Sequence, residues 1–143
     1  MKNRIVSLIC ALVIIMGLPA TACASEVTPR ASEYFSFTDV RARAAGDGKV
    51  RIEIEINATH MMDEVGASYI YIYEQQSDGT YDMVYTFRKT AYPSMIVEDS
   101  FFGYVDVTYQ GIPGHRYYAY VGCYAKDSNG AETLFFSTNS VVA

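Results

Sequence analysis

The residues that could perform catalysis or hold a metal are few, and their spacing matches no familiar site. The two histidines, His60 and His115, are far apart in the sequence and show neither HxH nor HxxxH spacing. Each could act as a base or a ligand only if the fold brought a carboxylate to it. The serine motifs GxSxG and SxxK are both absent. We therefore expect no catalytic residue, no metal ligand and no bound cofactor, and we expect that the protein is not an enzyme.

The acidic residues are explained more simply by exposed strands and turns than by chemistry. Glu53 and Glu55 are consecutive outward positions of one predicted strand, so we interpret them as part of a solvated face. Residues 127–130 (DSNG) are similar to part of a calcium loop, but the later bidentate glutamate is missing at the required spacing. We predict a hairpin turn there.

The first two dozen residues have the pattern of a bacterial signal peptide. Lys2 and Arg4 precede an apolar run of about 14 residues, which is shorter than the roughly 20 that span a bilayer. Small residues at Ala22 and Ala24 indicate cleavage after residue 24. We predict a signal peptide over 1–24, a flexible leader over 25–33 and a secreted domain over 34–143, with no membrane insertion after cleavage. The alternative is a lipid anchor at Cys23.

The cysteine positions and the net charge exclude several kinds of site and partner. Cys10 and Cys23 lie in the signal region, so only Cys123 belongs to the mature chain, which excludes an internal disulfide and a cysteine-based zinc site. We expect Cys123 to be a small buried residue on the inner face of a strand. All 16 acidic but only nine of the 11 basic residues follow the signal region, which gives a mature net charge of −7. Such a surface repels phosphate backbones, so we expect no nucleic-acid partner.

The mature chain reads as a series of strands without a convincing helix. In residues 49–58, valine and isoleucine alternate with charged or polar residues, which predicts a half-buried antiparallel strand. Residues 59–66 break the pattern and predict a loop, and residues 88–99 are irregular around Pro93. The other predicted strands span 35–44, 68–75, 81–87, 101–110, 117–125 and 133–142.

One segment resembles a known family. Residues 112–125 combine a leading aliphatic residue, a Pro-Gly turn, Tyr117 and alternating small residues, and they resemble the corner and F strand of fibronectin type III domains. The chain is also similar to small exported bacterial domains of unknown function, which share the Gly-x-Gly-Lys turn at 46–49 and an entry such as that at 65–67. The resemblance implies an all-β fold, an antiparallel two-sheet immunoglobulin-like (fibronectin type III-like) sandwich of about seven strands, in an extracellular setting.

The resemblance carries three further expectations. Tyr117 should be buried, with its hydroxyl bonded to backbone a few residues upstream. The two histidines should lie at opposite ends of the sandwich, and no catalytic residue is implied. The sequence has no tryptophan, so the volume of the usual core tryptophan must be filled by other residues. The candidates are Ile52, Ile54, Tyr104 and either Phe101 or Phe102.

The tyrosines are the remaining functional signal. They alternate with Ile70 and Ile72 in one predicted strand, and a similar alternation recurs in two others. If the aliphatic residues face the core, the tyrosines share an exposed face. Such a face either binds a partner or merely stabilises the sheet through cross-strand pairs. The candidate binding face consists of Tyr69, Tyr71, Tyr73, Tyr81, Tyr85, Tyr118 and Tyr120.

These observations predict an exported, non-enzymatic binding or interaction domain. Its partner would be a protein or a glycan at the cell surface. A structural spacer or an assembly subunit of the cell surface is the alternative, and a secreted enzyme without a recognisable motif comes last.

Overall fold

The computed structural model describes residues 32–143. The predicted signal peptide (1–24), the alternative anchor at Cys23 and the predicted leader up to residue 31 lie outside the described residues. Within 32–143, the only helical element is a short 3-10 turn, and no helix is long and apolar enough to cross a membrane. The elements are β1 (Phe35–Gly46), β2 (Lys49–Gln75), β3 (Tyr81–Arg88), η1 (Pro93–Met95), β4 (Ile96–Gln110), β5 (Arg116–Asp127), β6 (Gly130–Ser137) and β7 (Val141–Val142).

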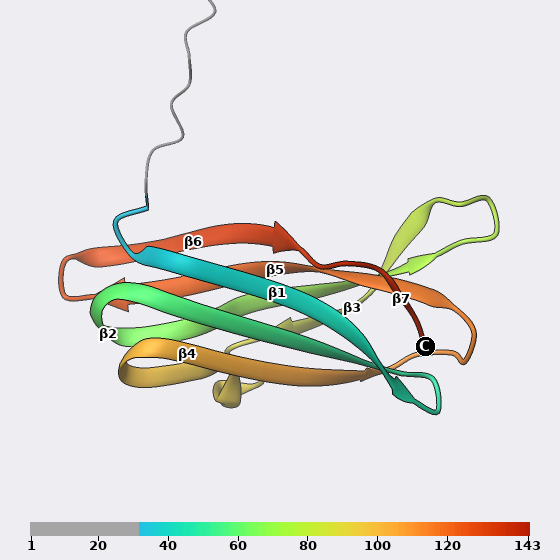
Figure 1. Cartoon of the computed structure of the whole chain (residues 1–143), viewed down its shortest axis with the longest axis horizontal. Coiled ribbons are helices and arrows are strands. Elements are labelled where there is room, and N and C mark those ends of the chain that lie inside the picture. The colour runs from blue at the N-terminus through green and yellow to red at the C-terminus, as the bar shows by residue number, and fades with distance from the viewer. Residues whose placement is uncertain (1–31) are drawn as a thin grey trace, which may run out of the picture. The chain divides into compact units, whose positions relative to one another are not determined.

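The seven strands form one strongly curled antiparallel sheet, a half-barrel built around β2 (Figure 1). The first part of β2 pairs with β1 and β4, and its last part pairs with β3 and β5. β6 and β7 both pair with β5. The expected all-β antiparallel architecture is confirmed, and β2 is the strand that pairs with β1, β3, β4 and β5.

The predicted loop at 59–66 is wrong, because β2 continues through it as a strand of 27 residues. Residues 62–66 stay extended by pairing with the start of β4, and residues 64–67 pair with β5. β2 therefore bends where its pairing changes from β1 and β4 to β3 and β5. Gly66 permits this close packing, since a Cβ at that position would lie 2.0 Å from the carbonyl oxygen of Met95.

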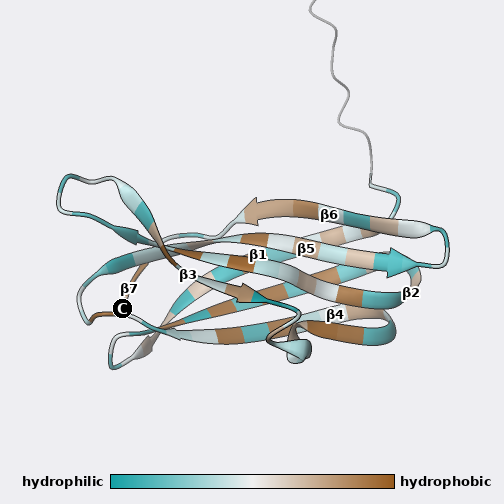
Figure 2. Cartoon of the chain, turned by 180° about the vertical axis from the view of Figure 1, so that it is seen from behind, coloured by the Kyte–Doolittle hydropathy of each residue, from teal (hydrophilic) through white to brown (hydrophobic). Residues whose placement is uncertain are grey.

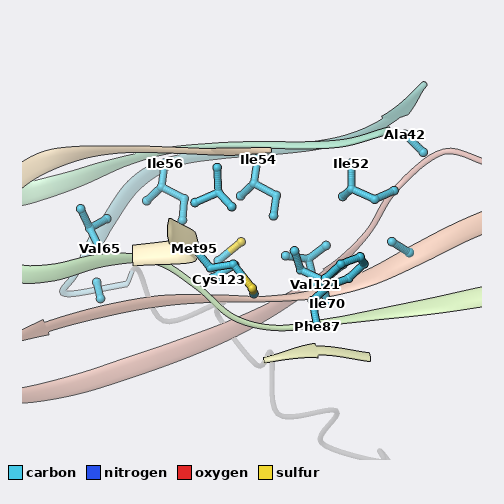
Figure 3. Packing of buried hydrophobic residues seen from close by; sticks show 14 of the residues in the cluster. Ala42, Ile52, Ile54, Ile56, Val65, Ile70, Phe87, Met95, Val121 and Cys123 are labelled. Carbon is cyan, nitrogen blue, oxygen red and sulfur yellow. The ribbon is translucent and has the colours of Figure 1, made fainter. Parts of the chain in front are cut away.

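Alternation along the strands places the core inside the curl. Ile52, Ile54 and Ile56 of β2 point toward Ile70 of the same strand and Val121 of β5, which lie across the interior (Figure 3). Hydrophobic and hydrophilic bands alternate along the strands, as expected when one face is buried (Figure 2). Full burial of each isoleucine contributes about 1.5–3 kcal/mol.

The expectation for the core without tryptophan is only half right. Ile52 and Ile54 are fully buried, but Tyr104, Phe101 and Phe102 are 47, 59 and 40% exposed. Phe102 and Tyr104 lie in the outward phase of β4. Phe101 has the phase of the buried Val105, but it lies where the β2–β4 pairing is broken. The largest fully buried side chains include Tyr117, Met62 and Met95.

The expected tyrosine corner is confirmed. Tyr117 at the start of β5 is fully buried, and its hydroxyl accepts a hydrogen bond of 2.9 Å from the backbone N–H of Ile112. Burial raises the pKa of the Tyr117 phenol, against the opposing effect of this hydrogen bond. Gly111 lies against the tyrosine ring, since a Cβ there would come within 2.8 Å of it.

Candidate functional site

The last part of β2 and the neighbouring β5 carry tyrosines on one face and small or aliphatic residues on the other. Ile70 and Ile72 are buried, as the predicted face assignment requires, and Val121 is buried on β5. Tyr71 lies directly opposite Tyr120 in the β2–β5 ladder. Directly opposite residues share a face of the sheet, so the two strands present their tyrosines together.

The tyrosine rings contact one another across three strands. Tyr73 of β2 stacks on Tyr118 of β5 with ring centroids 4.9 Å apart and planes within 6°. Tyr81 of β3 meets Tyr118 edge-on, also at 4.9 Å. Tyr69 and Tyr71 stack at 5.8 Å within β2. Burial raises the pKa of the Tyr118 phenol, and the adjacent Tyr73 and Tyr81 add to this effect.

Six of the seven predicted residues therefore gather on one surface. A residue that the sequence did not single out extends it, because Phe135 of β6 stacks on Tyr120 at 5.2 Å. In the sequence, Phe135 stands between Leu134 and Phe136, which both pack against the core. This alternation is the signal that predicts an outward-facing Phe135. Tyr69 and Tyr120 are 38 and 37% exposed. The outer tyrosine face, as we call it below, consists of Tyr69, Tyr71, Tyr73, Tyr81, Tyr118, Tyr120 and Phe135.

Tyr85 does not belong to this face, so its predicted place was wrong. A shift in the β2–β3 register falls between the pairs Ile72–Tyr85 and Tyr73–Met83, and it leaves Val84 as an extra residue in β3. An extra residue reverses the faces of a strand beyond it. Tyr85 consequently points to the core side, where its ring contacts Phe87 edge-on at 4.9 Å.

Basic side chains lie at one end of the outer tyrosine face. The Arg88 guanidinium lies 6.0 Å from the ring centroid of Tyr69, and Lys89 Nζ lies 3.7 Å from that of Tyr124. Lys89 also donates a 2.7 Å hydrogen bond to Glu64, which lowers the pKa of that carboxyl. Two cation–π contacts and one ion pair therefore lie together at this end of the face.

Each histidine is joined to its own carboxylate. His60 Nε2 lies 2.9 Å from Asp127 Oδ2, and His115 Nδ1 lies 2.5 Å from Glu74 Oε1. Glu74 pairs with the first residues of β5 and Asp127 ends that strand, so the two pairs lie at opposite ends of β5. A neighbouring carboxylate is the condition under which either histidine could act as a base or a ligand.

The His60–Asp127 pair, called the clamp below, lies beside the segment that leads into β1. The Thr59 hydroxyl donates to the Glu33 carbonyl at 2.6 Å and lies 2.9 Å from His60 Nδ1. Both ring nitrogens of His60 are thus engaged, one with Thr59 and one with Asp127. The hydrogen bond from His60, together with those from Asn129 and Gly130, holds the pKa of Asp127 well below its usual range.

Cys123 lies fully buried on β5, as expected. Burial raises the pKa of its thiol to about 12. The thiolate that nucleophilic or metal-binding chemistry needs is therefore scarce at neutral pH. Among residues 32–143, no group of three or more His, Cys, Asp or Glu side chains is placed to hold a metal ion.

Comparison with known proteins does not place the chain in a family. No family model, curated protein or solved structure matches it.

Proposed function

We propose that this chain is an exported, non-enzymatic binding domain that contacts a protein partner through the outer tyrosine face. The observation that carries the proposal is the gathering of six tyrosines and Phe135 over four adjacent strands, opposite a buried inner face. Tyrosine offers a large apolar area and a hydroxyl at a small entropic cost of ordering. Exposed aromatic surfaces of this kind commonly mark contact sites.

The ring geometry favours a protein over a glycan. Sugars stack on open aromatic ring faces, whereas the rings here stack mainly on one another, as Tyr73 does on Tyr118 and Tyr120 on Phe135. Stacking covers one face of each ring and leaves the edges and hydroxyls of both rings open to a partner. Edges and hydroxyls suit the mixed apolar and hydrogen-bonding contacts of a protein interface.

The proposal includes an immunoglobulin-like arrangement of the curled sheet, close to that of fibronectin type III domains. In this assignment β1, the first part of β2 and β4 form one layer, and β3, the last part of β2, β5 and β6 form the other. The exchange of partners along β2 and the tyrosine corner at Tyr117 support it. Such a sandwich leaves the outer face of each layer free for contacts.

Export is the second part of the proposal, and it rests on the sequence of residues 1–24. Cleavage after residue 24 would release a secreted domain, and a partner at the cell surface would then be accessible. Mass spectrometry of the protein from its native source tests this. A terminus at Ser25 is the expected result, and a lipid-modified Cys23 or an intact residue 1 would contradict it.

The binding experiment compares the protein with a Tyr71→Ser/Tyr120→Ser double variant. Both are immobilised and exposed to envelope extract of the producing cells, and the retained proteins are identified and then purified for affinity measurement. We expect the double variant to bind the purified partner at least about 30-fold more weakly, since central aromatic anchors contribute about 2 kcal/mol or more. Tyr104→Ser on β4 is the matched control, because Tyr104 is exposed outside the outer tyrosine face.

Two outcomes would change the conclusion. Equal binding by the wild-type protein and the double variant would leave the tyrosines as a stabilised sheet surface and would favour a spacer or assembly role. Glycan-array binding that the double variant loses would keep the face but replace the protein partner by a sugar.

A further inference from the structure

A groove of about 370 Å³ opens between β3 and β4, on the side of β3 that does not carry the outer tyrosine face. In the described part of the chain, β3 and β4 each pair only with β2, so the groove lies along two sheet edges that are not joined to each other. The segment that links these strands contains η1 and supplies Tyr92 to the groove. The lining residues are Tyr85, Phe87, Tyr92, Thr108, Tyr109 and Gln110.

Three tyrosines form the walls of the groove, and Phe87 forms its buried floor. Phe87 is only 5% exposed, and the rings of Tyr85 and Tyr92 stand at 68° and 65° to it, with centroids 4.9 and 5.0 Å away. Tyr109 lies beside Tyr85 at 5.7 Å. The hydroxyls of Tyr85 and Tyr92 are hydrogen-bonded at 2.7 Å, which fixes the two walls relative to each other. The groove is thus shaped before any ligand enters.

The electrostatics of the groove favour a cation. None of the six lining residues is charged, and aromatic ring faces carry the negative part of the ring quadrupole. Burial, together with the charge of Glu74, raises the pKa of Tyr109, so this carboxylate acts on the groove wall. The hydrogen bond with Tyr85 raises the pKa of Tyr92. These two phenols stay neutral at physiological pH, and the whole chain carries a net charge of −5.

We propose that this groove binds the trimethylammonium group of a choline-type small molecule. A primary ammonium or a guanidinium needs acceptors for its N–H groups, and carboxylates, its strongest acceptors, are absent from the lining. A quaternary ammonium has no N–H and is recognised by aromatic walls through cation–π attraction. Thr108 and Gln110 at the β4 side offer polar contacts to the remainder of the molecule. The site is separate from the outer tyrosine face, so it does not depend on the proposed protein partner.

The charge requirement is tested on the purified protein by NMR titration. Choline is compared at constant ionic strength with its neutral isostere, in which a carbon atom replaces the quaternary nitrogen. We expect saturable shifts confined to the groove residues and an affinity for choline about tenfold above that for the isostere. Equal affinities, or the absence of saturable shifts, would overturn the proposal.

Variants of Tyr92 test the role of the ring. Tyr92→Leu removes the aromatic wall and should weaken choline binding about tenfold, whereas Tyr92→Phe keeps the ring and should bind within about twofold of the wild type. Tyr120→Leu on the outer tyrosine face is the control and should leave choline binding unchanged. Wild-type affinity in Tyr92→Leu, or a loss in Tyr120→Leu, would contradict the assignment. If Tyr92→Leu does not fold, the isostere comparison still decides.

Discussion

The side-chain amide of Asn139 makes both hydrogen bonds of a strand partner with the backbone of Ala42. Its Oδ1 accepts from the Ala42 N–H at 3.0 Å, and its Nδ2 donates to the Ala42 carbonyl at 2.9 Å. The preceding Thr138 exchanges two hydrogen bonds of 2.9 Å with the backbone of Ala119 on β5. Two consecutive residues between β6 and β7 therefore tie β5 to the otherwise unpaired edge of β1.

Removing this amide should loosen β1. Asn139→Ala leaves the N–H and C=O of a buried alanine without their partners, which costs about 1–3 kcal/mol of unfolding free energy. Urea denaturation measures the loss, and hydrogen exchange at the Ala42 amide should accelerate. Asn139→Asp keeps an acceptor but no donor, so we expect a partial effect. An unchanged Ala42 exchange rate in Asn139→Ala would show that the amide contributes nothing to holding β1.

The tyrosine corner gives a second prediction for stability. Tyr117→Phe removes the hydroxyl that accepts from Ile112 and leaves that N–H unpaired, so the denaturation midpoint should fall by the equivalent of about 1–3 kcal/mol. Tyr118→Phe alters the adjacent, partly exposed tyrosine and should stay within about 0.5 kcal/mol. Equal effects of the two substitutions would contradict a special role for the corner.

Asp127 should make stability depend on pH in the acid range. Its pKa in the folded chain is lowered by His60 and by the turn residues, so the stabilisation is complete above the unfolded pKa of about 4 and declines as pH falls toward the folded value. Asp127→Asn retains the shape but loses the charge. The difference in unfolding free energy between the two proteins should be complete above about pH 4 and should shrink steadily below it.

The control for this experiment is Asp82→Asn, an exposed carboxylate on β3. This substitution removes one negative charge outside the clamp, so a pH dependence found only in Asp127→Asn belongs to the clamp. A gap between wild type and Asp127→Asn that stays constant from pH 6 to pH 2 would show that the carboxylate charge plays no part in the clamp.

Cys123 should resist thiol reagents until the chain unfolds. Burial raises its thiol pKa to about 12, so both access and the thiolate fraction are low near pH 8. Alkylation followed by peptide mapping should show little modification of Cys123 in buffer and complete modification in denaturing urea. Rapid alkylation of the folded protein would mean that β5 opens locally.

Period-two alternation already determined much of the fold. It separates Ile70 and Ile72 from the tyrosines between them, because successive side chains of a strand must point to opposite faces. The Pro-Gly corner likewise predicted the buried Tyr117 and its backbone hydrogen bond. These features depend on residues close together in the chain, so local sequence carries them.

Tertiary structure decided what depends on residues that are distant in sequence. The extra residue at Val84 becomes visible only when β3 is aligned with β2, and it moves Tyr85 from the outer tyrosine face into the groove with Tyr92 and Tyr109. The same holds for His60, whose carboxylate partner is 67 residues away. Alternation fixes the phase within a strand, but the register between strands and the folding of the sheet onto itself are set by the packing of the whole core.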